Sequence, residues 1–151
     1  MSVKEFSREI SINAPRVKVW AALTGADIMA QWVTVFTGGA PVIFAGDYNA
    51  IGEVQCLAGD GSGDGMINRI VEYKAEEKMV WEHTANLIKG ERQEFSGKDA
   101  EWKGLRQSFI LSDEKSEVKL SLTVQFPDSY DDFSGKWREA LAKIKELAEK
   151  A

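Results

Sequence analysis

The segment from Phe6 to Trp32 constrains the fold more than any other part of the chain, because it joins a strand pattern directly to a helical one. Phe6, Ile10 and Ile12 fall on one face of a period-2 pattern, and polar residues occupy the other face. This alternation predicts a half-buried strand at the start of the fold.

Two short helices are expected immediately after this strand. Asn13 can offer a side-chain oxygen to the free amides of a helix start, and Pro15 suits the first helical turn because it needs no donor there. Thr24-Gly25 closes the first helix and starts a second one, which brings Trp32 toward the interior.

The end of the chain changes from a period of two to a helical period. Within Glu117 to Phe126, apolar and polar residues alternate without exception, which predicts a strand with one buried face. From Tyr130 to Lys150 an amphipathic helix is expected, with Ser129 and Asp132 at capping-box spacing. Its apolar stripe is Phe133, Trp137, Ala140, Leu141, Ile144, Leu147 and Ala148.

Between these ends, glycine-punctuated runs predict a series of hairpins. Strands in succession, closed by one long helix, predict an α+β fold in which a curved antiparallel sheet of six to seven strands wraps around the C-terminal helix. The expected strands are Asp47 to Leu57, Met66 to Tyr73, Met79 to Ala85, Gly104 to Leu111 and Glu117 to Phe126, with a further pairing near Val33 to Phe36.

Both ends of the chain resemble one family. The opening run Ile12-Asn13-Ala14-Pro15, then Val19-Trp20, Leu23-Thr24 and Gln31-Trp32, and the closing Gly135 and Trp137 with the leucine-rich stripe, resemble SRPBCC proteins, the START-like and birch-pollen-allergen-like superfamily. Within it the chain is most similar to the branch named after an activator of a heat-shock chaperone ATPase. The resemblance implies the helix-grip fold, with a ligand space between sheet and helix. It does not identify one chemistry, because this superfamily hosts binders, cyclases and co-chaperone modules.

Composition narrows the class of partner. At 151 residues, 1–151 is expected to be a single domain. The net charge of −5 comes from spread basic and acidic residues, so neither nucleic acid nor a membrane is an expected partner. The N-terminus has no apolar signal core, and the single Cys56 agrees with a reducing compartment, so a cytoplasmic location is expected. Monomer and homodimer both stay open.

Three polar side chains, Arg8, His83 and Gln107, fall on strand faces that are otherwise apolar. If they face inward, they either satisfy one another or wait for a ligand. Alternatively, Arg8 reaches solvent, His83 lies at the sheet rim and Gln107 bonds to a neighbouring backbone. With the aromatic residues expected around them, the pocket candidates are Arg8, Trp32, Tyr48, Trp81, His83, Gln107, Phe109 and Trp137.

No catalytic, metal or cofactor site is predicted. His83 is the only histidine, and its sequence neighbour Glu82 points to the opposite strand face. The loop from Gly59 to Gly65 matches neither a phosphate-binding nor a calcium-binding pattern, and is expected to be a hairpin connection.

The segment from Lys89 to Lys103 is polar and lacks clean periodicity, yet it contains Trp102. It is interpreted either as a lid over the cavity mouth or as an ordinary long loop.

Three functions are therefore weighed. The first is binding of a hydrophobic small molecule without catalysis. The second is a protein-interaction module that alters a chaperone ATPase, and the third is a cyclase-like or aromatase-like enzyme in which Arg8 and His83 would orient and protonate the substrate.

Overall fold

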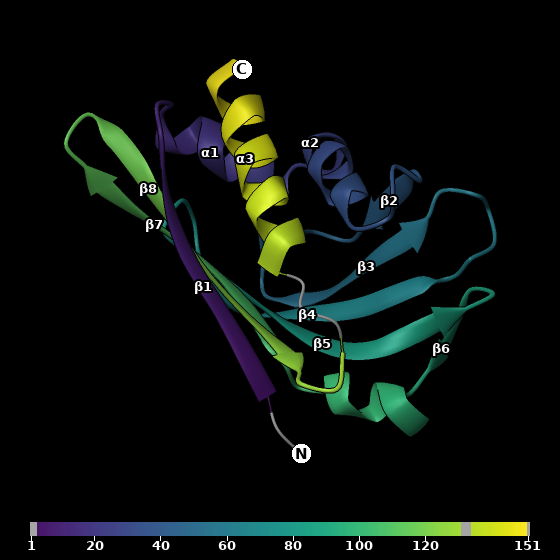
Figure 1. Cartoon of the computed structure of the whole chain (residues 1–151). Helices are drawn as coiled ribbons and strands as arrows, with labels where there is room; N and C mark the ends of the chain where they lie inside the picture. Colours follow the sequence, from purple (N-terminus) through teal and green to yellow (C-terminus); the bar gives the residue numbers. More distant parts are fainter. Residues whose placement is uncertain (1–2, 131–133, 151) are drawn as a thin grey trace.

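The computed structural model describes residues 3–130 and 134–150. Its central feature is an antiparallel sheet with the strand order β1-β8-β7-β5-β4-β3-β2, with the short β6 paired to β5. The sheet curves around the C-terminal helix (Figure 1). The elements are β1 (Val3–Ile12), α1 (Arg16–Thr24), α2 (Ala26–Trp32), η1 (Val33–Val35), β2 (Val42–Ala45), β3 (Gly52–Ala58), β4 (Gly65–Lys74), β5 (Lys78–Ile88), β6 (Glu91–Gln93), η2 (Gly97–Trp102), β7 (Arg106–Glu114), β8 (Glu117–Pro127) and α3 (Ser134–Lys150). The predicted α+β helix-grip architecture is confirmed.

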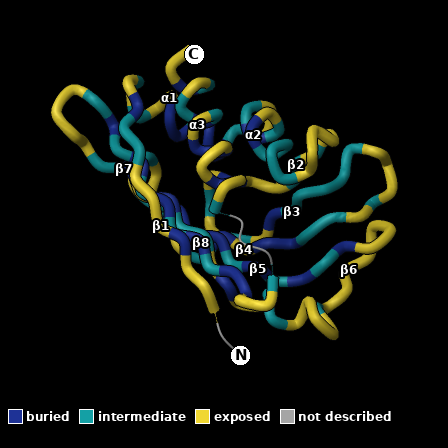
Figure 2. Tube along the Cα trace, viewed as in Figure 1, coloured by how far each residue is buried: buried dark blue, intermediate teal, exposed yellow. Residues whose placement is uncertain are grey.

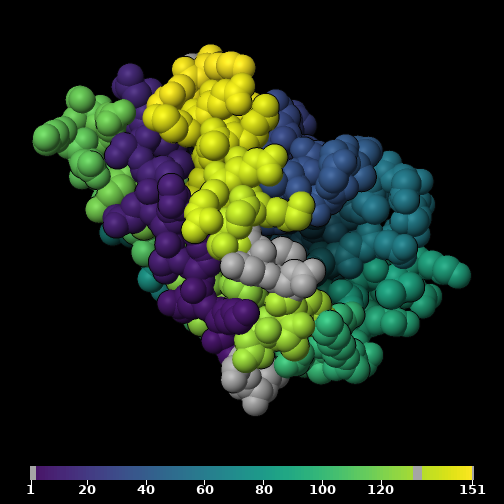
Figure 3. Space-filling model, viewed as in Figure 1, coloured from purple at the N-terminus to yellow at the C-terminus, as the bar shows by residue number. Residues whose placement is uncertain are grey.

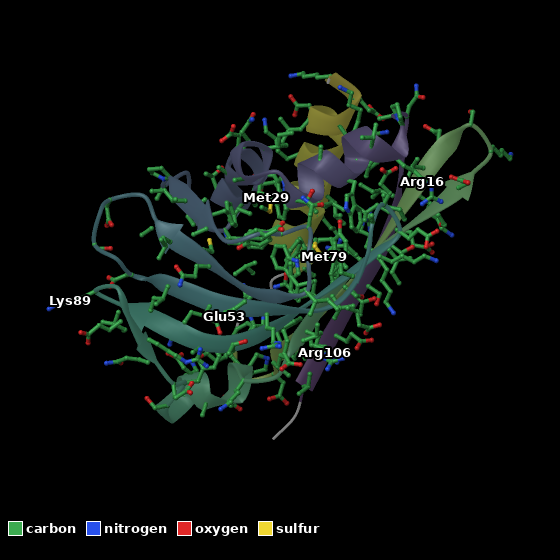
Figure 4. The ribbon with its side chains drawn as sticks, turned by 180° about the vertical axis from the view of Figure 1, so that it is seen from behind. Arg16, Met29, Glu53, Met79, Lys89 and Arg106 are labelled. Carbon is green, nitrogen blue, oxygen red and sulfur yellow. The ribbon has the colours of Figure 1, made fainter. Side chains whose placement is uncertain are left out.

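The core lies between the inner face of the sheet and the helices. Buried residues concentrate along the sheet and on the helix sides that face it (Figure 2). In β8 the predicted alternation holds, with Val118, Leu120, Leu122, Val124 and Phe126 buried. In α3 the buried stripe is Trp137, Ala140, Leu141, Ile144 and Ala148. Met29 on α2 and Met79 on β5 lie in this interior (Figure 4).

The corner between α1 and α2 depends on Gly25. Its backbone N–H donates to the Ala21 carbonyl at 2.8 Å, which ends α1, and its own carbonyl accepts the first bonds of α2. A Cβ at this position would lie 2.8 Å from the Ala21 oxygen, which is closer than real Cβ contacts. The expected cap at Asn13 is wrong, because the N-cap is Pro15 and no side chain caps α1. Instead the Asn13 N–H donates to Glu149 Oε2 at 2.7 Å and ties the connection between β1 and α1 to α3.

The structure corrects several other boundaries. The expected pairing near Val33 to Phe36 is wrong, since these residues start with the helical turn η1 that continues from α2. The strand expected from Asp47 begins only at Gly52, and β2 and β6 were not predicted. Both missed strands are short and lie at the sheet edge or at its end, where period-2 patterns are weak. The expected contributions of Asp132 and Phe133 lie outside the described residues.

Polar contacts fix a hairpin at one end of the sheet. Arg16 donates to Asp113 Oδ1 at 3.0 Å on the β7–β8 hairpin, and Lys89 lies at the opposite end of the sheet (Figure 4). Across residues 3–130 and 134–150, no helix is long and apolar enough to cross a membrane.

Candidate ligand-binding cavity

A cavity of about 230 Å³ lies between the inner face of the sheet, α2 with η1, and α3. The surface is hollowed on the side where α2, the middle strands and the start of α3 meet (Figure 3). The sheet and the three-dimensional placement of the helices thus bring together residues from nearly the whole chain. The residues that line the cavity are Trp32, Val33, Phe36, Phe44, Cys56, Met66, Asn68, Trp81, His83, Trp102, Gln107, Val124, Phe126 and Trp137.

A hydrogen-bonded row of polar side chains crosses one wall of the cavity. Asn68 on β4 and His83 on β5 are register partners, and Asn68 Oδ1 lies 2.9 Å from His83 Nδ1. On the other side of the ring, Gln107 Nε2 of β7 lies 3.4 Å from His83 Nε2. The row therefore spans three adjacent strands, and two of the three expected polar residues meet in it.

Burial keeps His83 neutral. The side chain is 5% exposed, and loss of solvation lowers the pKa of His83 to about 4. Because an amide oxygen only accepts, Nδ1 carries the proton and donates to Asn68. Nε2 is then the acceptor for the Gln107 amide N–H. In this state His83 is a fixed link in a hydrogen-bond chain near neutral pH.

Two polar atoms beside this row have no hydrogen-bond partner among the residues that the structure describes. They are Trp81 Nε1, a donor, and Gln107 Oε1, an acceptor. Both are covered from solvent, and both side chains line the cavity. Most buried polar groups in proteins are paired, so this donor and acceptor require an explanation.

Aromatic rings form the remaining walls. Trp137 of α3 packs against Phe36 with ring centroids 4.7 Å apart and against Trp32 at 6.2 Å. The Trp32 indole is held in place because its Nε1 donates to the Ala22 carbonyl at 2.7 Å. Large rings with few rotatable bonds make a wall that keeps its shape.

Trp102 lies edge-on to His83, with ring centroids 5.3 Å apart. Tyr130, in the segment before α3, packs on the other side of Trp102 at 5.1 Å. The Tyr130 hydroxyl donates to Asp99 Oδ1 at 2.6 Å, and Ser129 Oγ donates to Glu101 Oε2 at 2.5 Å. These contacts fasten η2, at the end of the polar segment, to the chain that enters α3.

The structure places the eight expected pocket residues in three positions. Trp32, Trp81, His83, Gln107 and Trp137 line the cavity. Tyr48 and Phe109 are buried behind the cavity wall, and their ring centroids lie 5.5 Å and 5.3 Å from that of Trp81. Arg8 differs from expectation: it is exposed on the edge strand β1 and lines an outer groove beside Arg138. It shares a strand face with the buried Phe6, but β1 is the edge strand of the sheet, and the Arg8 side chain is exposed there.

Asn68 is a polar residue of the cavity lining that sequence reasoning missed. It alternates with Met66 and Ile70 on β4, so the rule that singled out His83 and Gln107 also applies to it. Cys56 belongs to the wall as well, and burial raises the pKa of its thiol to about 11. Glu82 faces away from the cavity, as expected, and its Oε2 pairs with Arg106 at 3.1 Å.

The loop from Gly59 to Gly65 joins β3 to β4 as a hairpin connection. Its acidic side chains accept backbone hydrogen bonds: Asp60 Oδ1 accepts from the Ser62 N–H within the loop at 2.9 Å, and Asp64 Oδ1 accepts from the Lys89 N–H of the β5–β6 turn at 2.9 Å. Within the described ranges, no cluster of three or more histidine, cysteine or acidic side chains could hold a metal ion.

Comparison with known proteins finds solved structures with the same fold, but no protein that matches in sequence. No family model matches the chain, and no curated protein matches it in sequence. The solution structure of the Aha1 dimer from Colwellia psychrerythraea superposes with a TM-score of 0.67 at 18% identity, covering 97% of this chain and 96% of that one. The chain has the fold of Aha1-like proteins.

Other structures share this helix-grip fold at equally low identity. The AHSA1-like protein from Aeromonas hydrophila matches with a TM-score of 0.69 at 16% identity, covering 97% of this chain and 93% of that one. DynU16, from the dynemicin biosynthetic locus, matches with a TM-score of 0.64 at 12% identity, covering 96% of this chain and 47% of that one. The expected resemblance to the SRPBCC superfamily is thus confirmed at the level of the fold.

Proposed function

We propose that this protein binds a small, mainly apolar molecule in the cavity between the sheet and α3. The observation that carries the proposal is the cavity itself, about 230 Å³ with aromatic walls and one hydrogen-bonded polar row. A mostly apolar, concave site with a few convergent polar groups is the usual form of a small-molecule site.

The lining defines the charge and size of the ligand. None of the described side chains around the cavity is a lysine, arginine, aspartate or glutamate, so a charged ligand would lose its hydration without gaining a partner. An engineered cavity of roughly 150 Å³ holds benzene, so one of this size suits a molecule of about nine non-hydrogen atoms. A neutral molecule with one or two rings fits both limits.

Native mass spectrometry of freshly purified protein tests the proposal directly. Extra mass that is lost on denaturation would support a bound small molecule, which extraction would identify, and the same spectrum gives the number of copies in the assembly. If the mass is bare, saturable binding of 2-naphthol, a neutral fluorescent two-ring molecule, is the second readout.

A pair of tryptophan variants makes this readout specific. Trp81→Ala removes part of the cavity wall, so it should abolish 2-naphthol binding. Trp20→Ala removes an equally large buried side chain that does not line the cavity, so binding should persist. Equal loss in both variants, with both still folded, would count against the cavity as the binding site.

A protein-interaction role is the second proposal, and the likeness in fold to the Aha1 structure supports it. Its test is the ATPase rate of a heat-shock chaperone with and without this protein, and an unchanged rate would exclude it. The cyclase-like role gains no support from the geometry, because Arg8 lies outside the cavity that contains His83.

A further inference from the structure

The unpaired donor and the unpaired acceptor belong to residues that face each other across two strands. Trp81 of β5 and Gln107 of β7 are register partners, and both line the cavity. Side chains directly opposite each other on one face of an antiparallel pair lie close together. The side chains that carry the free N–H and the free C=O are therefore neighbours on one wall.

The polar row explains why the Gln107 oxygen is the atom left over. Asn68 Oδ1 accepts the proton of His83 Nδ1, so His83 Nε2 is unprotonated and accepts from Gln107 Nε2. The Gln107 amide is thereby oriented with its nitrogen toward His83. Its oxygen is the remaining group, fixed in place by the buried ring.

Two other buried indoles in the same fold use their donors. Trp32 Nε1 donates to the Ala22 carbonyl at 2.7 Å, and Trp20 Nε1 donates to the Tyr73 hydroxyl at 3.3 Å. Leaving a buried donor or acceptor without a partner destabilises the fold. Trp81 Nε1 and Gln107 Oε1 are two such unpaired atoms, and both belong to side chains that line the cavity.

Resting on the proposed function, we propose that the ligand is a neutral molecule with a hydrogen-bond acceptor and a donor side by side, as in a lactam. Its carbonyl accepts from Trp81 Nε1, and its N–H donates to Gln107 Oε1. The rest of the molecule is apolar and packs against the aromatic walls. Because both protein atoms are covered from solvent, the lactam displaces the side-chain atoms that cover them when it binds.

This assignment separates neutral ligands by their polar groups. A carboxylate offers only acceptors and brings a charge that no described side chain around the cavity neutralises. A hydrocarbon fills the space but leaves both protein atoms unpaired. A ketone satisfies Trp81 alone, so the lactam is the member of the series that satisfies both atoms.

Three molecules of nearly identical shape test this order: oxindole has the carbonyl and the N–H, 2-indanone has the carbonyl alone, and indane has neither. Their dissociation constants are measured on the full-length 15N-labelled chain from its indole N–H signals. Oxindole is expected to bind roughly tenfold more tightly than 2-indanone, which is the usual scale for one buried hydrogen bond. The Trp81 signal, assigned by its loss in Trp81→Phe, should move on addition of oxindole.

Trp81→Phe keeps an aromatic wall and removes no existing hydrogen bond, so it should fold and bind oxindole roughly tenfold more weakly, with indane unchanged. Trp32→Phe is the matched control. Trp32 also lines the cavity, but its Nε1 is already bonded to Ala22, so the preference for oxindole over indane should persist.

The outcomes distinguish the inference from the function on which it rests. Equal binding of oxindole and 2-indanone would overturn the lactam assignment while leaving the cavity as a binding site. The same holds if the Trp81 signal is already that of a hydrogen-bonded indole in the free protein and oxindole leaves it unchanged. If none of the three molecules binds, the proposed function fails with the assignment.

Discussion

At the scale of single residues, the cavity depends on a neutral histidine held between two amides. Asn68 takes the proton of His83 Nδ1 at 2.9 Å, and Gln107 donates to Nε2 at 3.4 Å. Asn68 is buried, and Gln107 is half-buried with its Oε1 covered from solvent. Such a row is stable only when its members are all present, because a buried polar group that loses its partner is costly.

Replacing Asn68 with alanine should therefore destabilise the fold. Asn68→Ala leaves the His83 Nδ1–H unpaired in a buried site, with an expected loss of about 1–3 kcal/mol in the free energy of unfolding. Urea denaturation followed by tryptophan fluorescence measures this loss. Asn49→Ala is the control, because Asn49 is exposed and its hydrogen bond to Tyr73 competes with water. An equal loss in both variants would contradict the role of the buried row.

The lowered pKa of His83 makes stability depend on pH in a defined window. In the unfolded chain the ring titrates near its ordinary value of 6.5, whereas burial lowers its pKa to about 4 in the fold. Above about pH 6.5 both states are neutral and His83 adds no pH dependence. As the pH falls from 6.5 toward 4, the unfolded state takes up the proton first, so the free energy of unfolding should decrease by up to about 3 kcal/mol.

Urea denaturation between pH 5 and pH 7 measures this slope. His83→Phe keeps a ring at the position but has no group that titrates, so its slope between these pH values should be flatter than that of the native chain. Carboxylates contribute mainly at lower pH and are present in both proteins. Equal slopes in His83→Phe and the native chain would show that His83 titrates in the folded state as it does in the unfolded one.

At the scale of elements, η2 is a part of the wall that side-chain contacts hold in place. Its Trp102 ring lies against His83, and its Asp99 and Glu101 side chains accept hydrogen bonds from Tyr130 and Ser129 in the segment before α3. Asn86 Nδ2 of β5 also donates to Asp99 Oδ2 at 3.4 Å, and none of these contacts is a ladder hydrogen bond. Segments with few ladder hydrogen bonds open more readily than the strands that flank them.

Removing one of these fastenings should loosen η2 without unfolding the sheet. Tyr130→Phe keeps the ring that packs on Trp102 and removes the hydroxyl that donates to Asp99 at 2.6 Å. Limited trypsin digestion should then cleave after Lys98 and Lys103 several-fold faster than in the native chain. Lys115, in the turn between β7 and β8, serves as an internal control, because cleavage there should not change.

The same digestion distinguishes a lid from an ordinary loop. If η2 covers the cavity mouth, saturating 2-naphthol should slow cleavage after Lys98 and leave cleavage after Lys115 as it was. Cleavage that is unaffected by the probe would assign the segment from Lys89 to Lys103 to the surface alone.

At the scale of the whole molecule, the regular strands and helices were predictable from the sequence, and the contacts between residues on different elements were not. The alternation in β8 and the stripe of α3 specify buried faces directly, because each depends on local periodicity. The inward position of His83 followed from the same rule. Its pairing with Asn68 did not, since the β4–β5 ladder shifts register between Ile67 and Asn68, and this irregularity decides which residues are opposite each other.

The position of Arg8 marks another limit of local reasoning. Its strand face was correctly inferred from Phe6, which is buried, yet Arg8 itself is exposed. An edge strand has a neighbouring strand on one side only, so the burial of each side chain depends on what covers that edge, which no pattern within the strand reveals. The lid segment is similar, because the contact of Trp102 with His83 joins two segments without shared periodicity.

An interior cavity sets stability against binding, since filling it would strengthen packing and exclude the ligand. Cys56→Leu adds apolar volume at a half-buried wall position on β3. We expect the free energy of unfolding to rise by about 1 kcal/mol and 2-naphthol binding to weaken roughly tenfold. Cys56→Ala, which enlarges the cavity, should lose some stability and keep binding. If Cys56→Leu becomes more stable yet binds the probe as tightly as the native chain, the ligand occupies another part of the surface.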